Sequence, residues 1–116
     1  MDAHKPERWS VSVTDAPQAV LQIPADARRQ RQFEISVAMT VSLRQPAAGA
    51  WHQMTVLVDG TQQWQRRVPT HNPGAFDGLE YRFSRALPVG QTLRVVVSAA
   101  CQGGGRRSLV VEADEV

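Results

Sequence analysis

The chain has 116 residues, of which 42% are hydrophobic and 21% are charged. This composition is typical of one globular core and argues against a disordered chain. No apolar run approaches the ~18 residues of a membrane span, and the first ten residues lack the apolar stretch of a secretory signal. We therefore expect one domain over residues 1–116 and no membrane partner. The sequence leaves the compartment open between a cytoplasmic protein and a mature fragment of an exported one.

Positive charge is concentrated in the middle of the chain. The formal net charge is only +2, but residues 28–107 hold eleven arginines and four acidic residues, a local charge of +7. Arginine pairs such as Arg28-Arg29, Arg66-Arg67 and Arg106-Arg107 suggest a surface that binds polyanions. Neighbouring residues on a strand point to opposite faces, however, and no aromatic residues are interleaved with the arginines. The pattern favours solvated surface charge over nucleic-acid binding.

Strand-like alternation recurs along the chain. It is clearest over residues 33–43, where six apolar side chains occupy every second position. The other expected strands are residues 9–13, 20–23, 79–87, 93–101 and 108–113. Residues 14–31 interrupt the pattern, because Pro17 and Pro24 bracket either a short edge strand or one helical turn. The spacing predicts an all-β fold, a two-sheet antiparallel β-sandwich of immunoglobulin type with seven or eight strands.

Residues 51–68 predict a β-hairpin around Asp59-Gly60. We expect a three-residue loop over 58–60, because that register pairs Met54 with Trp64. The apolar side chains of the hairpin then share one buried face, and Trp51 falls on the opposite face.

Residues 87–99, LPVGQTLRVVVSA, resemble the corner before the last hairpin of fibronectin type III and related immunoglobulin-like domains. This resemblance covers about a tenth of the chain and implies a sandwich fold without functional residues. It departs from the family pattern at Leu93, where those domains usually carry a tyrosine.

Cys101 is the single cysteine, so the chain cannot form an internal disulfide. With Arg107 and Ser108 it fits the C-x5-R-S spacing of a cysteine phosphatase loop, in which a thiolate attacks phosphorus. Residues 109–111 are strand-like, whereas that loop needs a following helix. We therefore interpret Cys101 as a buried cysteine followed by a glycine-rich hairpin turn.

The candidate ligand-binding residues are Trp51, His52, His71, Asn72, Phe76 and Asp77. Trp51 is a candidate sugar-stacking surface, and residues 71–78 combine a histidine, an amide, an aromatic ring and a carboxylate in one connection. The alternative is that this connection only crosses between sheets. No histidine has metal-ligand spacing and the acids are too scattered for calcium, so we expect no metal, no cofactor and no catalytic residues.

The leading functional hypothesis is a non-enzymatic module that binds another protein through loops or an edge strand. The second is a carbohydrate- or small-ligand-binding module around Trp51, His52 and the 71–77 loop. A cysteine-dependent enzyme is the third. The sequence specifies neither the partner nor the oligomeric state.

Overall fold

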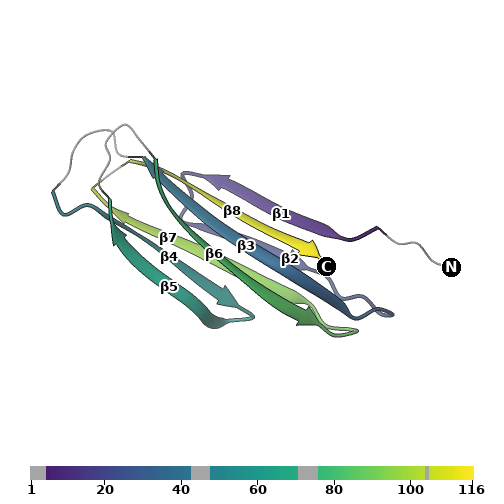
Figure 1. Ribbon diagram of the computed structural model, residues 1–116. Coiled ribbons are helices and arrows are strands. Elements are labelled where there is room, and N and C mark those ends of the chain that lie inside the picture. The colour runs from purple at the N-terminus through teal and green to yellow at the C-terminus, as the bar shows by residue number, and fades with distance from the viewer. Residues whose placement is uncertain (1–4, 43–47, 71–75, 104) are drawn as a thin grey trace.

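The computed structural model describes residues 5–42, 48–70, 76–103 and 105–116, with only the backbone of Phe76. These residues form eight strands: β1 (Arg8–Thr14), β2 (Gln18–Ile23), β3 (Arg31–Ser42), β4 (Trp51–Val58), β5 (Thr61–Pro69), β6 (Phe76–Leu87), β7 (Leu93–Gln102) and β8 (Arg106–Glu115). The strands run along the length of a molecule of 58 × 26 × 18 Å (Figure 1). Within the described ranges there is no helix long and apolar enough to cross a membrane.

The strands form two antiparallel four-stranded sheets. Sheet A has the order β1-β8-β3-β6, and sheet B has the order β2-β7-β4-β5. The pairs β1–β8, β2–β7, β3–β6 and β4–β5 are nested, as if one long hairpin had been rolled up. Eight strands nested in this way are a jelly roll. The two-sheet antiparallel sandwich and its eight strands are therefore confirmed.

The strand order differs from that of the immunoglobulin fold, in which strands A, B, E and D face strands C, F and G. Here β7 pairs with β2 and β4, while β8 pairs with β1 and β3. The glycine-rich segment after Cys101 therefore crosses between sheets, and the hairpin expected there was wrong. The likeness of residues 87–99 to immunoglobulin-like domains extends to the sandwich and not to its connectivity.

The core lies between the sheets and follows the alternation of the strands. Phe33, Ile35 and Val37 on β3 are at most 1% exposed, and they share the core with Val95 and Val97 on β7, which are fully buried. Burying an aliphatic or aromatic side chain of this size contributes about 1.5–3 kcal/mol. One continuous cluster of 20 buried hydrophobic residues connects the two sheets.

In the β4–β5 hairpin the predicted side chains share one face, but the two strands pair in a different register. Val58 pairs with Thr61, so Asp59 and Gly60 form a two-residue turn with φ of 49° and 83°. A bulge follows, after which Val56 pairs with Trp64. The expected three-residue loop was wrong, because the extra residue is inserted in the strand instead of the turn. Trp64 still packs against the core.

Residues 14–31 contain the short edge strand β2, one of the two expected alternatives. Next to it, an ionic cluster joins three segments of the chain. Nη1 of Arg31, whose side chain is 2% exposed, lies 2.8 Å from Glu7 Oε1. Arg29 bridges Glu7 and Glu115 at 2.8 Å each, and its hydrogen bond to Glu115 raises the pKa of Arg29. These arginines are structural and are not free surface charge.

Candidate binding surfaces

Trp51 and His52 were expected to share a site, but they lie on opposite faces of sheet B. His52 is 1% exposed and faces the core, whereas Trp51 is half-buried on the outer face. Adjacent residues of a strand must point in opposite directions, so one ligand cannot contact both side chains from the same surface. The predicted pairing of these two residues was wrong.

His52 belongs to a buried polar cluster between the sheets. Its Nδ1 lies 2.7 Å from Thr70 Oγ1, and its Nε2 has no hydrogen-bond partner among the described residues. Burial lowers the pKa of His52, and the Asp77 carboxylate and the Gly78 backbone only partly oppose that shift. Asp77 of β6 is half-buried. The structure thus brings His52 near Asp77, but inside the sandwich.

His71 and Asn72 lie outside the described residues. The backbone of Phe76, the first residue of β6, pairs with Ser42 of β3. The connection that contains these residues leads from β5 of sheet B to β6 of sheet A, so it crosses between the sheets. That crossing was the structural alternative given to this segment.

Trp51 is the centre of a side-chain assembly on the outer face of sheet B. The guanidinium carbon of Arg67 lies 3.8 Å from the centroid of the Trp51 ring. Arg67 Nε donates to Gln53 Oε1 at 2.9 Å, and Trp51 Nε1 donates to Gln102 Oε1 at 2.8 Å. A hollow of about 330 Å³ adjoins this assembly, lined by Gly49, Ala50, Trp51, Arg67, Val68 and Pro69. The sequence pointed to Trp51 but not to its partners, which come from β5 and β7.

A second surface lies where the edge strands β5 and β6 face each other across the sandwich. Trp64 of β5 stacks on Tyr81 of β6 with ring centroids 4.8 Å apart, and Tyr81 stacks on Phe83 at 5.5 Å. All three rings are half-buried. On the opposite side of the molecule the backbones of β1 and β2 approach within 8 Å, whereas side chains bridge β5 and β6. We call the surface formed by Trp64, Tyr81 and Phe83 the lateral aromatic cluster.

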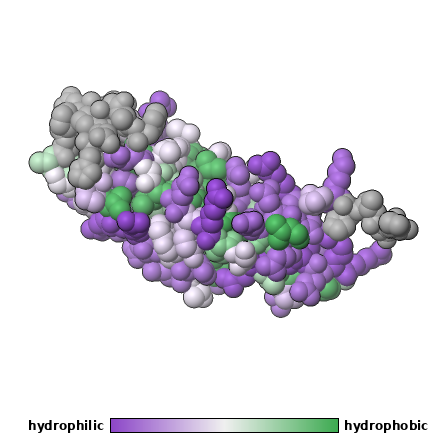
Figure 2. All heavy atoms as spheres, in the orientation of Figure 1, coloured by the Kyte–Doolittle hydropathy of each residue, from purple (hydrophilic) through white to green (hydrophobic). Residues whose placement is uncertain are grey.

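Arginine and glutamine side chains surround the lateral aromatic cluster. Gln63 Nε2 donates to Tyr81 Oη at 3.3 Å, and Arg85 Nη2 donates to Gln63 Oε1 at 3.1 Å. The buried Nε of Arg85 has no partner in the described chain. Arg66, also on the inward side of β5, is exposed and has no ion pair among the described residues. The face in Figure 2 is mostly hydrophilic, with hydrophobic residues in small separated groups.

Cys101 shares the inward face of β7 and pairs with His52 across to β4, but it is half-buried, not fully buried. Arg107 lies in strand β8, where a phosphatase loop would need a helix. Its backbone N–H donates to Asp15 Oδ1 and its Nε to the carbonyl of Ala16. Arg107 therefore holds the end of β1. Across the described part of the chain, no three histidine, cysteine or acidic residues are grouped as metal ligands would be.

Fold and surfaces together define an eight-stranded jelly-roll sandwich with two candidate binding surfaces. No protein-family model matches the chain, and neither does any curated protein. Among solved structures, dimeric latent PorU from Porphyromonas gingivalis has a TM-score of 0.58 at 10% identity. The match covers 93% of this chain but only 13% of the PorU chain. At that identity it supports the fold alone.

Two further solved structures resemble the chain less closely. The insecticidal delta-endotoxin Cry8Ea1 from Bacillus thuringiensis has a TM-score of 0.43 and 16% identity, with 96% of this chain and 19% of the toxin covered. Infectious bursal disease virus, Gt strain, has a TM-score of 0.40 and 15% identity, with 95% and 32% covered.

Proposed function

We propose that the protein is a non-enzymatic binding module that takes up an extended segment of a partner protein along β6. The observation that carries the proposal is the stack of Trp64, Tyr81 and Phe83, which is half-buried between two unpaired sheet edges. Tryptophan, tyrosine and arginine dominate the energetics of protein interfaces, and here they lie together.

The β6 edge is suited to strand addition. β6 runs for 12 residues without proline, and among the described strands it pairs with β3 alone, so its other edge is suited to accept a partner strand. Two of the other three edge strands carry protective features: β5 has a bulge and ends at Pro69, and β2 is six residues long between Pro17 and Pro24. The third, β1, is seven residues long and so offers a shorter edge than β6. A strand added to β6 extends sheet A towards the lateral aromatic cluster.

Charge supports a partner segment with acidic side chains. Arg66 and Arg85 lie on the inward sides of β5 and β6, and neither has a carboxylate partner in the described ranges. The Nε of Arg85 is buried and has no acceptor among the described residues, so a carboxylate bound at the lateral aromatic cluster would reach it only after the Arg85 side chain shifts. Arginine with a carboxylate gives a charge-assisted bond, so acidic segments gain affinity over neutral ones.

The test is a pull-down from lysate of the source organism, followed by mass spectrometry and a binding titration with each recovered protein. The variant is Trp64→Ser with Arg66→Gln, and the matched control is Trp9→Ser with Arg8→Gln on the opposite edge strand. We expect the first variant to weaken binding about tenfold or more, and the control to bind like the wild type. Equal binding by all three proteins, each with a cooperative thermal transition, would refute the proposal.

A further inference from the structure

The outer face of sheet B has an unusual composition. The outward positions of its four strands follow from the pairing of β4 with β5 and β7, and of β2 with β7. Six of them are glutamines: Gln18, Gln22, Gln53, Gln62, Gln65 and Gln102. None of the 16 outward strand residues is acidic. These positions therefore offer amides and positive charge. One described carboxylate lies at the edge of the face, where Asp59 Oδ1 of the β4–β5 turn accepts from the Arg94 backbone N–H at 2.9 Å.

Most of these amides are available to a ligand. Gln53 and Gln102 hold Arg67 and Trp51, respectively. The side chains of Gln18, Gln22, Gln62 and Gln65 make no hydrogen bond to any described residue. Each carboxamide carries two N–H donors and one carbonyl acceptor, so a row of them matches a ligand whose hydroxyls both donate and accept.

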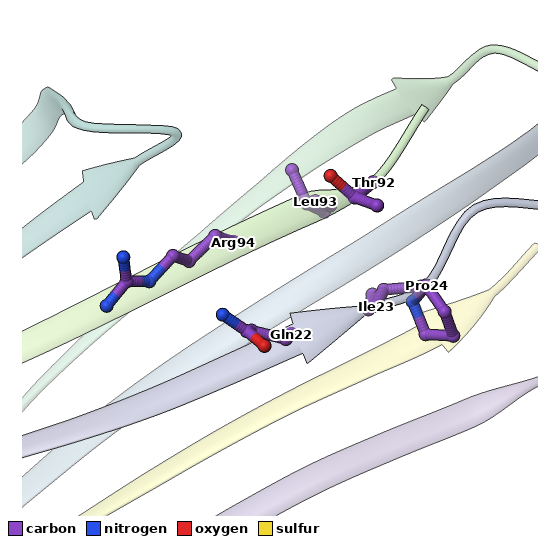
Figure 3. Close-up of a pocket in the computed structure, with 6 residues that line it drawn as sticks. All are labelled: Gln22, Ile23, Pro24, Thr92, Leu93 and Arg94. Carbon is purple, nitrogen blue, oxygen red and sulfur yellow. The ribbon is translucent and has the colours of Figure 1, made fainter. Parts of the chain in front are cut away.

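Two arginines lie at opposite ends of this face. Arg67 is held by its stack on Trp51 and by the bond from its Nε to Gln53, and its terminal nitrogens make no hydrogen bond to a described residue. Arg94 lies next to Gln22 at a hollow of about 440 Å³ lined by Gln22, Ile23, Pro24, Thr92, Leu93 and Arg94 (Figure 3). Neither guanidinium has an ion pair within the described chain. Arg94 is six residues from Ala100, the β7 residue level with Gln53 and Arg67, so the arginines are separated by about 20 Å along the strands.

We propose that the outer face of sheet B binds a carboxylate-bearing polysaccharide, with Arg67 and Arg94 each contacting a carboxylate and the glutamines contacting hydroxyls. Trp51 and its adjoining hollow contribute apolar contact to a sugar ring. Charge complementarity favours an acidic chain, because neither guanidinium has an ion pair among the described residues and none of the outward strand residues is acidic. A single-stranded nucleic acid is a poorer fit, since such ligands stack successive bases on several aromatic rings and this face has one.

The experiment is affinity electrophoresis in gels that contain polygalacturonate, its methyl ester or dextran, supported by calorimetric titration with the first. We compare the wild type with Arg67→Gln, Arg94→Gln and the double variant. Arg82→Gln is the matched control, because Arg82 is an exposed arginine on the outer face of sheet A and its loss changes the charge equally. All five proteins are first compared by thermal unfolding.

We expect retardation by polygalacturonate only, a fivefold or greater loss of affinity in each single variant, and complete loss in the double variant. Arg82→Gln should bind like the wild type. Three outcomes would each overturn the proposal: no retardation by polygalacturonate at low salt, equal losses of affinity in all three single variants, or retardation by the methyl ester or by dextran equal to that by polygalacturonate. Displacement of polygalacturonate by an equal concentration of single-stranded DNA would also count against it. Trp64 and Arg66 are unchanged in these variants. A failure to bind polygalacturonate is therefore distinguishable from a failure of the proposed protein-binding surface, which the pull-down tests separately.

Discussion

Arg31 Nη1 lies 2.8 Å from Oε1 of Glu7, a residue 24 positions earlier in the chain, and Arg31 is almost fully buried. A second donor of Arg31, Nη2, reaches the carbonyl of Pro24 at 2.7 Å, while its Nε has no partner among the described residues. Among the described residues, Glu7 is therefore the carboxylate that pairs with this buried guanidinium.

Glu7→Ala should destabilise the protein by about 3 kcal/mol, because it leaves the Arg31 charge buried without compensation. The measurement is the free energy of unfolding in urea at pH 7. Asp114→Ala is the control: Asp114 pairs with Arg8, whose side chain is 68% exposed, and such surface pairs contribute at most about 1 kcal/mol. Similar losses in the two variants would show that Arg31 does not depend on Glu7.

His52 should make stability depend on pH. Burial lowers the pKa of His52 in the folded state, so below the unfolded value of about 6.5 the unfolded chain binds more protons than the folded one. The contribution of His52 is thus fully present above that pH and is lost as the pH falls from 7 to 5. We expect this loss to be smaller in His52→Asn, which cannot titrate. Parallel decreases in both proteins, measured by urea unfolding at each pH, would contradict the assignment.

Gly78 should not tolerate a side chain. A Cβ at this position would lie 2.9 Å from the backbone oxygen of Met39 on β3, and backbone cannot move aside cheaply. Gly78→Ala is expected to cost about 1–3 kcal/mol of unfolding free energy, as overpacking typically does. A decrease in unfolding free energy below about 0.5 kcal/mol would mean that β3 and β6 move apart more readily than their pairing along both strands implies.

The stack of Trp64 on Tyr81 should appear as an energetic coupling. In a double-mutant cycle with Trp64→Leu and Tyr81→Leu, we expect a coupling of about 0.5–1.5 kcal/mol in unfolding free energy. The comparison cycle pairs Tyr81→Leu with Trp9→Leu on β1, at the far edge of sheet A, and should be additive. Additivity in the first cycle would show that the ring contact does not stabilise the lateral aromatic cluster.

Several parts of the candidate surfaces were predictable from sequence, and others were not. Strand alternation alone puts Trp51 and His52 on opposite faces, so grouping them in one site neglected a local signal that was present. The partners of Trp51 could not be predicted from sequence, because Arg67 and Gln102 come from different strands. The lateral aromatic cluster was missed for the same reason: Trp64 and Tyr81 belong to different sheets.

The sequence by itself determined the all-β class, seven or eight strands and the buried face of most of them, since a two-residue period is a local property of the chain. The tertiary structure decided the nested jelly-roll order, the bulge beside Trp64 and the ionic cluster around Arg31. Each of these depends on which distant strands pair and in which register. Those choices follow from the summed packing of one shared core, which no single segment encodes.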